Sequence, residues 1–328
     1  MKLLMLGGTY FLGRAIVEDA LKRGDTLTLF NRGKRATVFP DVETLIGDRT
    51  KDLSALEAEV ARGRTWDAVI DTSGYVPRVV KKTATLLKDA VRHYTFVSSI
   101  SVYAESVSQL TEQSAIATLA DETTEEITGE TYGALKALCE KTVESVFANQ
   151  VLNVRAGLIV GEYDASGRFL YWVSRIAKGG EVAVPRDGRT QFIDVRDLAH
   201  WILNSIENNL TGAFNVTGNF TRKSVFETCK KVSNSDAIFV EISDEILEAN
   251  QILPYTELPL WLPKAYSALE QVSIEKALAT GLTFRPLEET IRKTFEWYQA
   301  QSPDVQQKLL GASLKPEKEK KLITALQR

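Results

Sequence analysis

Apolar and polar positions in the N-terminal half of the chain follow two alternating patterns. Short apolar runs end at glycines or small polar residues, and longer stretches with apolar residues three and four apart follow them. The first pattern is typical of buried strands and the second of amphipathic helices. The first pattern predicts strands at 2–6, 26–30, 43–46, 68–70, 94–97 and 150–155. The second predicts helices at 11–23, 51–62, 76–90 and 131–148. This alternation predicts an α/β fold, a Rossmann-type doubly wound parallel sheet.

The alternation loosens beyond Gly157. The later pattern predicts helices at 169–178, 198–208, 221–233, 243–250, 263–270, 286–300 and 303–312, with strands at 181–184, 212–216 and 237–242. We therefore expect a dinucleotide-binding domain at 1–156, to which about 190–216 return, and a smaller α+β substrate lobe at 157–312. A charged tail, helical or frayed, follows at 313–328. Asp197 is the expected N-cap of the helix at 198–208.

Composition restricts the classes of function. The 328 residues include 40 Lys and Arg against 43 Asp and Glu, a net charge of −3, so no overall basic field indicates a nucleic-acid partner. Two cysteines are too few for a disulfide framework, which favours a reducing, cytoplasmic location. His93 and His200 form no metal-ligand spacing, and no metal is expected. No segment approaches the roughly 18 apolar residues of a transmembrane helix, so no membrane association is expected.

A glycine-rich turn lies between the first predicted strand and helix. Its residues are Gly7, Gly8, Thr9, Tyr10, Phe11, Leu12 and Gly13. Glycines let the backbone approach a pyrophosphate, and a helix N-terminus offers N–H donors and a positive dipole end. Strand, turn, helix and second strand fall within about thirty residues, the unit that binds dinucleotides.

The end of the second predicted strand indicates which dinucleotide is preferred. The strand stops at Asn31-Arg32, and Lys34 and Arg35 follow. Asn31 carries no charge that would repel a 2′-phosphate, and Arg32 is suited to bind one. We expect NAD(P) as the cofactor, with a preference for NADP. The alternative is a solvated basic turn.

The chemistry centres on Ser99, Tyr132 and Lys136. Tyr132 and Lys136 are four apart on a predicted helix, so their side chains share one face. A free phenol has a pKa of about 10, and a nearby ammonium lowers it toward the range useful for proton transfer. Ser99 ends a predicted strand and would hold the same substrate oxygen. Tyr-x-x-x-Lys alone is a weak signal, and a surface pair is its alternative.

Taken in order, these segments resemble the extended short-chain dehydrogenase/reductase superfamily of NAD(P)-dependent epimerases, dehydratases and reductases. The resemblance covers residues 1 to about 300 and includes 154–161, 192–198 and 281–286. The sequences of residues 97–104, 132–136 and 167–172 are similar to those of a subgroup of the NAD-dependent epimerase/dehydratase family, the bacterial isoflavone-reductase-like proteins. They are also similar to those of the chloroplast stem-loop RNA-binding proteins.

The resemblance implies roles for individual residues. Ser99 aligns with the catalytic serine, Tyr132 with the acid–base, and Lys136 with the lysine that binds the nicotinamide ribose and lowers the tyrosine pKa. Asp48 would meet the adenine amine, beside Arg49, and the adenosine side would be lined by Thr72, Ser73 and Gly74. The implied reaction is hydride transfer at a carbinol or carbonyl carbon of a small-molecule substrate. Family members commonly form homodimers through helices equivalent to 76–90 and 131–148.

Three departures from the family pattern concern the ligands. Tyr10 stands at the middle glycine of the glycine-rich turn, so the turn is wider there or holds the pyrophosphate differently. Leu158 replaces an asparagine of sugar epimerases, and Thr190-Gln191 replaces their Arg-Asp. Because a site built for hydrogen bonds discriminates strongly when a partner is missing, these changes disfavour a nucleotide-sugar substrate.

Candidate substrate residues follow the strand at 150–155. They are Asp164, Arg168, Tyr171 and Trp172. For Tyr171 and Trp172 the alternative is packing in the core of the second lobe.

Two other functions stay open on this fold. One is an RNA-binding or nuclease-like protein, against which the near-neutral charge and the intact Ser–Tyr–Lys set argue. The other is a regulator that senses a dinucleotide without turnover.

Overall fold

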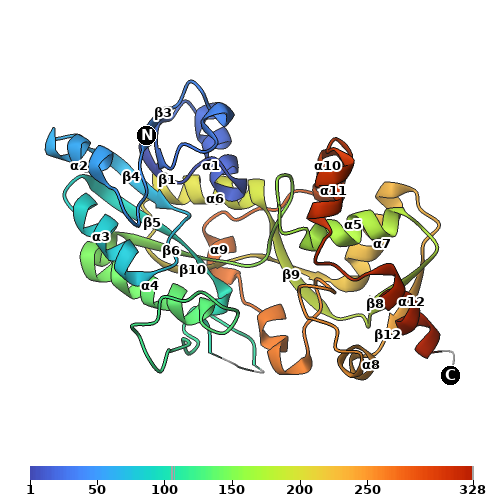
Figure 1. Cartoon of the computed structure of the whole chain (residues 1–328). Helices are drawn as coiled ribbons and strands as arrows, with labels where there is room; N and C mark the ends of the chain where they lie inside the picture. The colour runs from blue at the N-terminus through green and yellow to red at the C-terminus, as the bar shows by residue number, and fades with distance from the viewer. Residues whose placement is uncertain (105, 107, 327–328) are drawn as a thin grey trace.

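A seven-stranded parallel sheet forms the N-terminal lobe of the computed structural model, which describes residues 1–104, 106 and 108–326 (Figure 1). The strand order is β10-β6-β5-β4-β1-β2-β3. The strands are β1 (Lys2–Leu6), β2 (Thr26–Asn31), β3 (Glu43–Ile46), β4 (Trp66–Asp71), β5 (Val91–Ser99), β6 (Val151–Ala156) and β10 (Gly212–Val216). The central strands are apolar on both faces because helices cover both.

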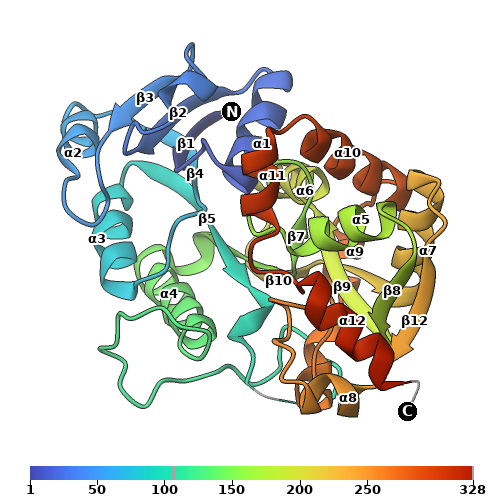
Figure 2. The same cartoon turned by 45° about the vertical axis from the view of Figure 1, so that its right-hand side comes forward.

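Helices pack on the two faces of this sheet in separate groups (Figure 2). One face carries α1 (Phe11–Lys22) and α6 (Val195–Glu207). The other carries α2 (Ser54–Ala61), α3 (Pro77–Leu87) and α4 (Tyr132–Phe147). The predicted doubly wound Rossmann-type sheet is therefore confirmed.

The sheet reverses its winding direction beside β1. From β1 the chain passes through α1 to β2 on one side, whereas β4 lies on the other. In doubly wound sheets a ligand crevice opens at this reversal, beyond the carboxyl ends of the strands. The turns after β1 and β4 meet there, and a Cβ on Gly7 would lie 2.9 Å from Thr72 Oγ1.

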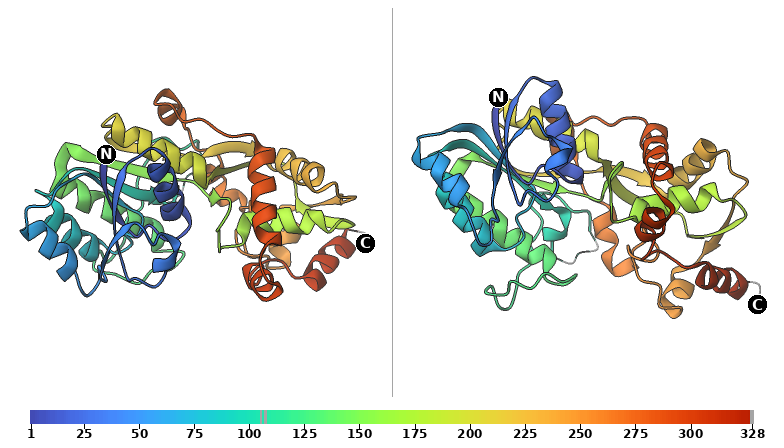
Figure 3. Two further views of the ribbon diagram at one scale, coloured as in Figure 1. Left: turned by 90° about the horizontal axis from the view of Figure 1, so that it is seen from above. Right: turned by 45° about the horizontal axis from the view of Figure 1, so that its top comes forward.

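The second lobe contains two small sheets and most of the C-terminal helices. One sheet joins β7 (Ile159–Val160), β9 (Arg189–Asp194) and β11 (Gly218–Thr221), and the other joins β8 (Glu181–Pro185) and β12 (Ile238–Ile242). The helices are α5 (Arg168–Ala177), α7 (Arg222–Ser233), α8 (Asp244–Ala249), α10 (Leu287–Gln299), α11 (Pro303–Leu309) and α12 (Pro316–Ala325). A further helix, α9 (Glu275–Ala279), packs back against β10 of the first lobe. The lobes lie side by side in every view (Figure 3).

The described part of the charged C-terminal segment, residues 313–326, is packed rather than frayed, and residues 327–328 of the predicted tail lie outside the described residues. Helix α12 lies against β8 and β12 in Figure 2, with Leu322 fully buried. Glu319 pairs with Arg175 of α5 at 2.8 Å, and Lys318 pairs with Glu257 at 2.6 Å. Of the two alternatives left open by the sequence, the helix is the one observed.

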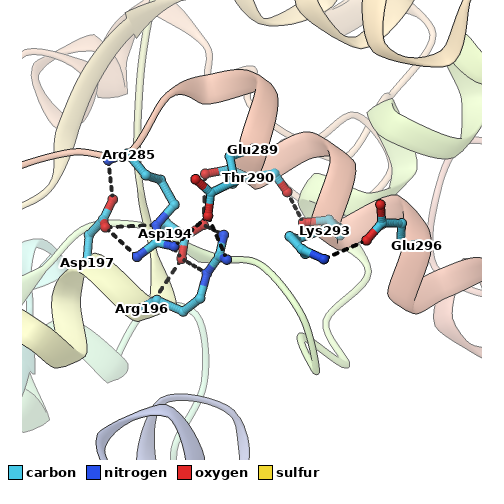
Figure 4. A network of polar contacts seen from close by, with 9 residues as sticks. Asp194, Arg196, Asp197, Arg285, Glu289, Thr290, Lys293 and Glu296 are labelled. Atoms are coloured by element: carbon cyan, nitrogen blue, oxygen red, sulfur yellow. Dashed lines mark hydrogen bonds and ion pairs between the residues drawn. The ribbon is translucent and has the colours of Figure 1, made fainter. Parts of the chain in front are cut away.

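A polar network joins the first lobe to α10 (Figure 4). Asp194 caps α6 by accepting the Arg196 backbone N–H at 2.8 Å, and it also accepts the Thr290 hydroxyl of α10 at 2.8 Å. The expectation that Asp197 is this N-cap was wrong, because the helix begins at Val195, just after the extended residue Asp194. Asp197 instead accepts the Arg285 guanidinium at 2.8 Å.

Asp194→Ala should lower the free energy of unfolding by about 2–4 kcal/mol, because it removes a helix cap and a buried acceptor shared by both lobes. Urea denaturation followed by circular dichroism measures this change. Glu296→Gln, which breaks the exposed Lys293–Glu296 pair on α10, is the matched control and should leave stability unchanged. Equal stability of Asp194→Ala and the unaltered protein would contradict the role given to the network.

Candidate functional site

A cleft with a volume of about 1360 Å³ runs along the carboxyl ends of the sheet strands, and both lobes line it. Pockets for one small ligand usually measure about 300–1,000 Å³, so this cleft has room for a cofactor and a substrate together. Its two ends differ in chemistry. One end holds the glycine-rich turn and basic residues, and the other holds Ser99, Tyr132 and residues of the second lobe.

The glycine-rich turn fits a pyrophosphate. Gly7 and Gly8 have φ values of +117° and +95°, which L side chains rarely adopt. A Cβ on Gly13 would lie 2.9 Å from the Gly8 backbone N, so the turn closes only with glycine there. Helix α1 starts without a capping side chain, which leaves the N–H groups of its first turn available to an anion.

Tyr10 is accommodated without its φ entering the left-handed region. Its backbone is extended at φ −140°, and the positive φ of 37° falls on Phe11 instead. The Tyr10 ring lines the cleft beneath the Arg35 guanidinium, 4.4 Å from the ring centre. Burial and the Asp164 carboxylate raise the pKa of Tyr10. The side chain at this position therefore spans from the glycine-rich turn toward the second lobe.

The ends of β2 and β3 line the same part of the cleft. Asn31 donates its side-chain amide to the Gly7 carbonyl at 3.2 Å and accepts the Gly33 backbone N–H at 2.8 Å. Arg32 also lines the cleft and is exposed. The Asp48 carboxylate accepts the backbone N–H and the hydroxyl of Thr50, which lower its pKa.

Arg49 lines the cleft, but its side chain turns into the protein. It donates to the Asp71 carboxylate at 2.6 Å and to the Ser73 hydroxyl at 3.1 Å, and the Tyr94 hydroxyl donates to the other Asp71 oxygen at 2.8 Å. Burial alone would raise the pKa of Asp71, but Arg49 outweighs it and holds the pKa below its ordinary value. Sequence reasoning missed Asp71 and Tyr94 as parts of the site. The one available signal was a carboxylate at the end of an otherwise apolar strand.

Lys136 lies at the bottom of the cleft and is 3% exposed. Its ammonium donates to the backbone carbonyls of Val97 at 2.6 Å and Gly74 at 2.8 Å. Burial lowers the pKa of Lys136 to about 8, and the nearby Asp71 carboxylate opposes this shift. Thr72 and Ser73 line the cleft, whereas Gly74 does not. Gly74 takes part in the site only through its backbone carbonyl, which accepts the Lys136 ammonium.

Tyr132 and Ser99 come together in the cleft. The phenol is mostly buried, which raises its pKa, whereas the nearby Ser99 hydroxyl and the charge of Arg168 oppose the rise. The Ser99 hydroxyl itself donates to the Ser101 hydroxyl at 3.1 Å. The expectation that Lys136 lowers this pKa was not met, because the lysine donates to two backbone carbonyls and burial dominates at the phenol. The cation acting on Tyr132 is Arg168, which comes from the second lobe.

The four candidate substrate residues divide into two pairs. Asp164 and Arg168 line the cleft. Tyr171 and Trp172 belong to the core of the second lobe, where the Trp172 ring N–H donates to the Pro259 carbonyl at 2.7 Å. Their assignment to the substrate pocket was wrong, because α5 is covered on nearly every side beyond its first residue.

Sequence reasoning missed further cleft residues. They include Ser101 and Leu269, which lie in 3₁₀ helices, and Ile127, Tyr255 and Leu262, which lie in irregular segments. Gln191, noted only as a departure from a family pattern, lines the cleft too.

The fold and site define a dinucleotide-dependent enzyme of the extended short-chain dehydrogenase/reductase type. The model of the NAD dependent epimerase/dehydratase family matches residues 3–217, and the chain belongs to this family. The predicted class, an NAD-dependent oxidoreductase or epimerase, is thereby confirmed.

Several solved structures share the fold over nearly the whole chain. The Bordetella bronchiseptica enzyme WbmH, in complex with NAD+, is 16% identical with a TM-score of 0.67, covering 91% of this chain and 98% of that one. UDP-glucuronic acid 4-epimerase from Bacillus cereus, in complex with NAD, is 15% identical with a TM-score of 0.64, covering 90% and 98%. The UDP-glucose 4-epimerase of Thermus thermophilus, in complex with NAD, is 18% identical with a TM-score of 0.63, covering 92% and 100%. No curated protein sequence gives a significant match.

Two kinds of site are not found in the described part of the chain. Residues 1–104, 106 and 108–326 contain no group of three His, Cys, Asp or Glu side chains placed to hold a metal ion. None of the helices described there has the length and apolar character needed to cross a membrane.

The buried Lys136 predicts a pH-dependent stability. Because its pKa falls from 10.5 to about 8 on folding, the folded protein binds fewer protons than the unfolded chain between these values. The free energy of unfolding should therefore rise with pH relative to Lys136→Met, by about 3 kcal/mol between pH 8 and 10.5.

Urea denaturation at several pH values measures this difference. Lys141→Met, at an exposed position of the same helix, is the matched control. A pH-independent difference between the unaltered protein and Lys136→Met would contradict the buried ammonium.

Proposed function

We propose that this protein transfers hydride between a carbinol carbon of a small-molecule substrate and a bound nicotinamide, with Ser99, Tyr132 and Lys136 as its catalytic residues. The observation that carries the proposal is that Ser99, Tyr132 and Lys136 line one cleft together with the glycine-rich turn. When bound, the nicotinamide cofactor supplies the hydride acceptor in oxidation and the hydride donor in reduction.

The residues of the protein transfer the proton and orient the reacting oxygen. In oxidation the phenolate form of Tyr132 accepts the hydroxyl proton while the carbinol hydrogen leaves as hydride to the bound nicotinamide, so the alcohol becomes a carbonyl and Tyr132 becomes a neutral phenol. In reduction the same phenol returns the proton. Ser99 donates its hydroxyl to the reacting oxygen, and Lys136 holds the end of β5 next to Ser99 through the Val97 carbonyl. A phenol with a raised pKa is a stable proton donor at neutral pH, which suits the reductive direction.

Tyr132→Phe should retain cofactor binding and lose turnover by about 10²–10⁴-fold, since it removes the proton donor but keeps the ring. Turnover is followed by nicotinamide absorbance on an identified substrate, and cofactor binding by calorimetry. Tyr75→Phe is the matched control, because Tyr75 lines the cleft 6.4 Å from the Tyr132 ring without contacting Ser99. Full activity of Tyr132→Phe would remove this mechanism.

We infer a preference for NADP over NAD. Arg32, Lys34 and Arg35 line the cleft beside the end of β2, and Asn31 places no carboxylate where an adenosine 2′-phosphate would lie. The solved structures cited above are complexes with NAD. They show which dinucleotide those proteins bind, and the preference between NAD and NADP in this chain is inferred from its own residues.

Calorimetric titration should show NADP binding about tenfold more tightly than NAD, because Arg32 gains a charge-assisted contact with the 2′-phosphate. Arg32→Ala should abolish this ratio, whereas Arg62→Ala, exposed and outside the cleft, should keep it. Tighter binding of NAD by the unaltered protein would refute the preference.

Three further expectations remain proposals. The division into a dinucleotide domain at 1–156 and a substrate lobe at 157–312 is supported by the end of β6 and by the return of β10 to the first sheet. A homodimer through α3 and α4 is supported by their packing side by side on one face, and sedimentation velocity distinguishes it from a monomer. A cytoplasmic location rests on the two free, buried cysteines, and cell fractionation tests it.

A further inference from the structure

One arginine at the substrate end of the cleft is not paired with a carboxylate. Arg168 opens α5, and its Nε donates to the Ser166 hydroxyl at 3.1 Å. Within residues 1–104, 106 and 108–326, no carboxylate oxygen lies within 4.0 Å of its guanidinium. The other basic side chains that line the cleft are engaged or distant: Arg49 and Lys136 are buried with partners, and Arg32, Lys34 and Arg35 lie beside β2.

The local backbone holds Arg168 in this position. Gly167 precedes it with φ +69°, and a Cβ there would lie 1.9 Å from the Leu309 carbonyl oxygen, so this residue must be glycine. Gly167 has no capping side chain, and although the Ser166 hydroxyl accepts the Arg168 backbone N–H at 3.4 Å, the N-terminal end of the ten-residue helix α5 carries its partial positive charge beside the guanidinium. Arg168 and this helix end place two sources of positive potential in one corner of the cleft.

An independent observation points to a ligand in the same corner. Tyr255 lines the cleft, and its hydroxyl is buried without a well-formed hydrogen bond in the described part of the chain. The Gln191 side chain lies nearby, but its oxygen already accepts the Thr217 hydroxyl at 2.6 Å. Burying a hydroxyl without a partner is costly, so a ligand oxygen would relieve it. Arg168, Tyr255 and Tyr132 line the same cleft, and the charge of Arg168 acts on both phenols.

The neighbouring groups do not neutralise this corner. Asp164 accepts the backbone N–H and the hydroxyl of Ser166, both at 2.9 Å. Burial raises the pKa of its carboxyl, which favours the neutral form, although Ser166 and the charge of Arg168 oppose this shift. The remaining walls are apolar and come from Leu158, Leu262 and Leu269. The corner is therefore suited to one anionic group on an otherwise compact ligand.

We propose that the substrate carries a carboxylate close to its reacting carbinol, and that Arg168 and Tyr255 bind this carboxylate while Ser99 and Tyr132 hold the reacting oxygen. Guanidinium and carboxylate match in a two-point hydrogen-bonded geometry, and a phenol adds a third donor. The substrate class is thus a hydroxy acid and its oxo acid. This inference rests on the proposed hydride transfer at Tyr132. A phosphate monoester offers the same oxygen acceptors and is distinguished below.

Calorimetric titration of the protein with and without saturating NADP tests the proposal, with lactate, its neutral amide lactamide, and inorganic phosphate as probes. Lactate should bind about ten- to a hundredfold more tightly than lactamide, because only the acid forms charge-assisted hydrogen bonds. Arg168→Gln should reduce this preference to within about twofold, and Arg168→Lys should keep part of it. Arg186→Gln, in the same lobe but outside the cleft, should keep it fully.

Equal binding of lactate and lactamide by the unaltered protein, or a preference that survives in Arg168→Gln, would overturn the proposal. Phosphate that binds through Arg168 more tightly than lactate would overturn the carboxylate and assign the corner to phosphate esters. Circular dichroism establishes that each variant is folded. The titration needs no turnover, so inactivity of the protein toward every alcohol would count against the hydride-transfer function while leaving the anion-binding result intact.

Discussion

A carboxylate that is completely shielded from water lies at the centre of the N-terminal lobe, and the cleft depends on how its charge is balanced. Asp71 ends β4, the strand next to the reversal of the sheet, and receives hydrogen bonds from Arg49, Tyr94 and the Ser73 backbone. An isolated buried charge is strongly unfavourable, and removing one partner of a buried pair commonly costs about 3–5 kcal/mol. The turns that carry Arg49 and Ser73 line the cleft, and their hydrogen bonds to the buried Asp71 carboxylate hold them in place.

The same carboxylate supports the proposed catalytic end. Lys136 is buried a short distance away, and the negative charge of Asp71 favours its ammonium form against the effect of burial. The ammonium binds the Gly74 and Val97 carbonyls, which belong to the segments after β4 and within β5. One buried cluster of charge thus connects the turns after β3 and β4 to the strand that presents Ser99, although these segments are far apart in sequence.

The fold was predictable from local pattern, and so was half of the site. Apolar runs that end at Gly7, Asp71 and Ser99 indicated strands whose carboxyl ends share one edge, and this geometry needs no long-range information. The pairing of Arg49 with Asp71 was not predictable, because it joins residues whose spacing has no period. Tyr171 and Trp172 were misplaced because large aromatic side chains suit a lobe core and a ligand pocket equally well, and only the packing of α5 shows that both rings lie in the core. Asp194 and Asp197 both suit a helix start, and only the backbone shows which one caps it.

The environment of Cys139 has a consequence for the chemistry of this protein. The thiol lies one helical turn beyond Lys136 and is fully buried, and burial raises its pKa to about 12 despite the neighbouring ammonium. The reactive form of cysteine is the thiolate, and an inaccessible neutral thiol resists alkylating agents and peroxide. A sulfur atom can therefore lie beside the proposed catalytic lysine without making the enzyme sensitive to oxidants while it stays folded.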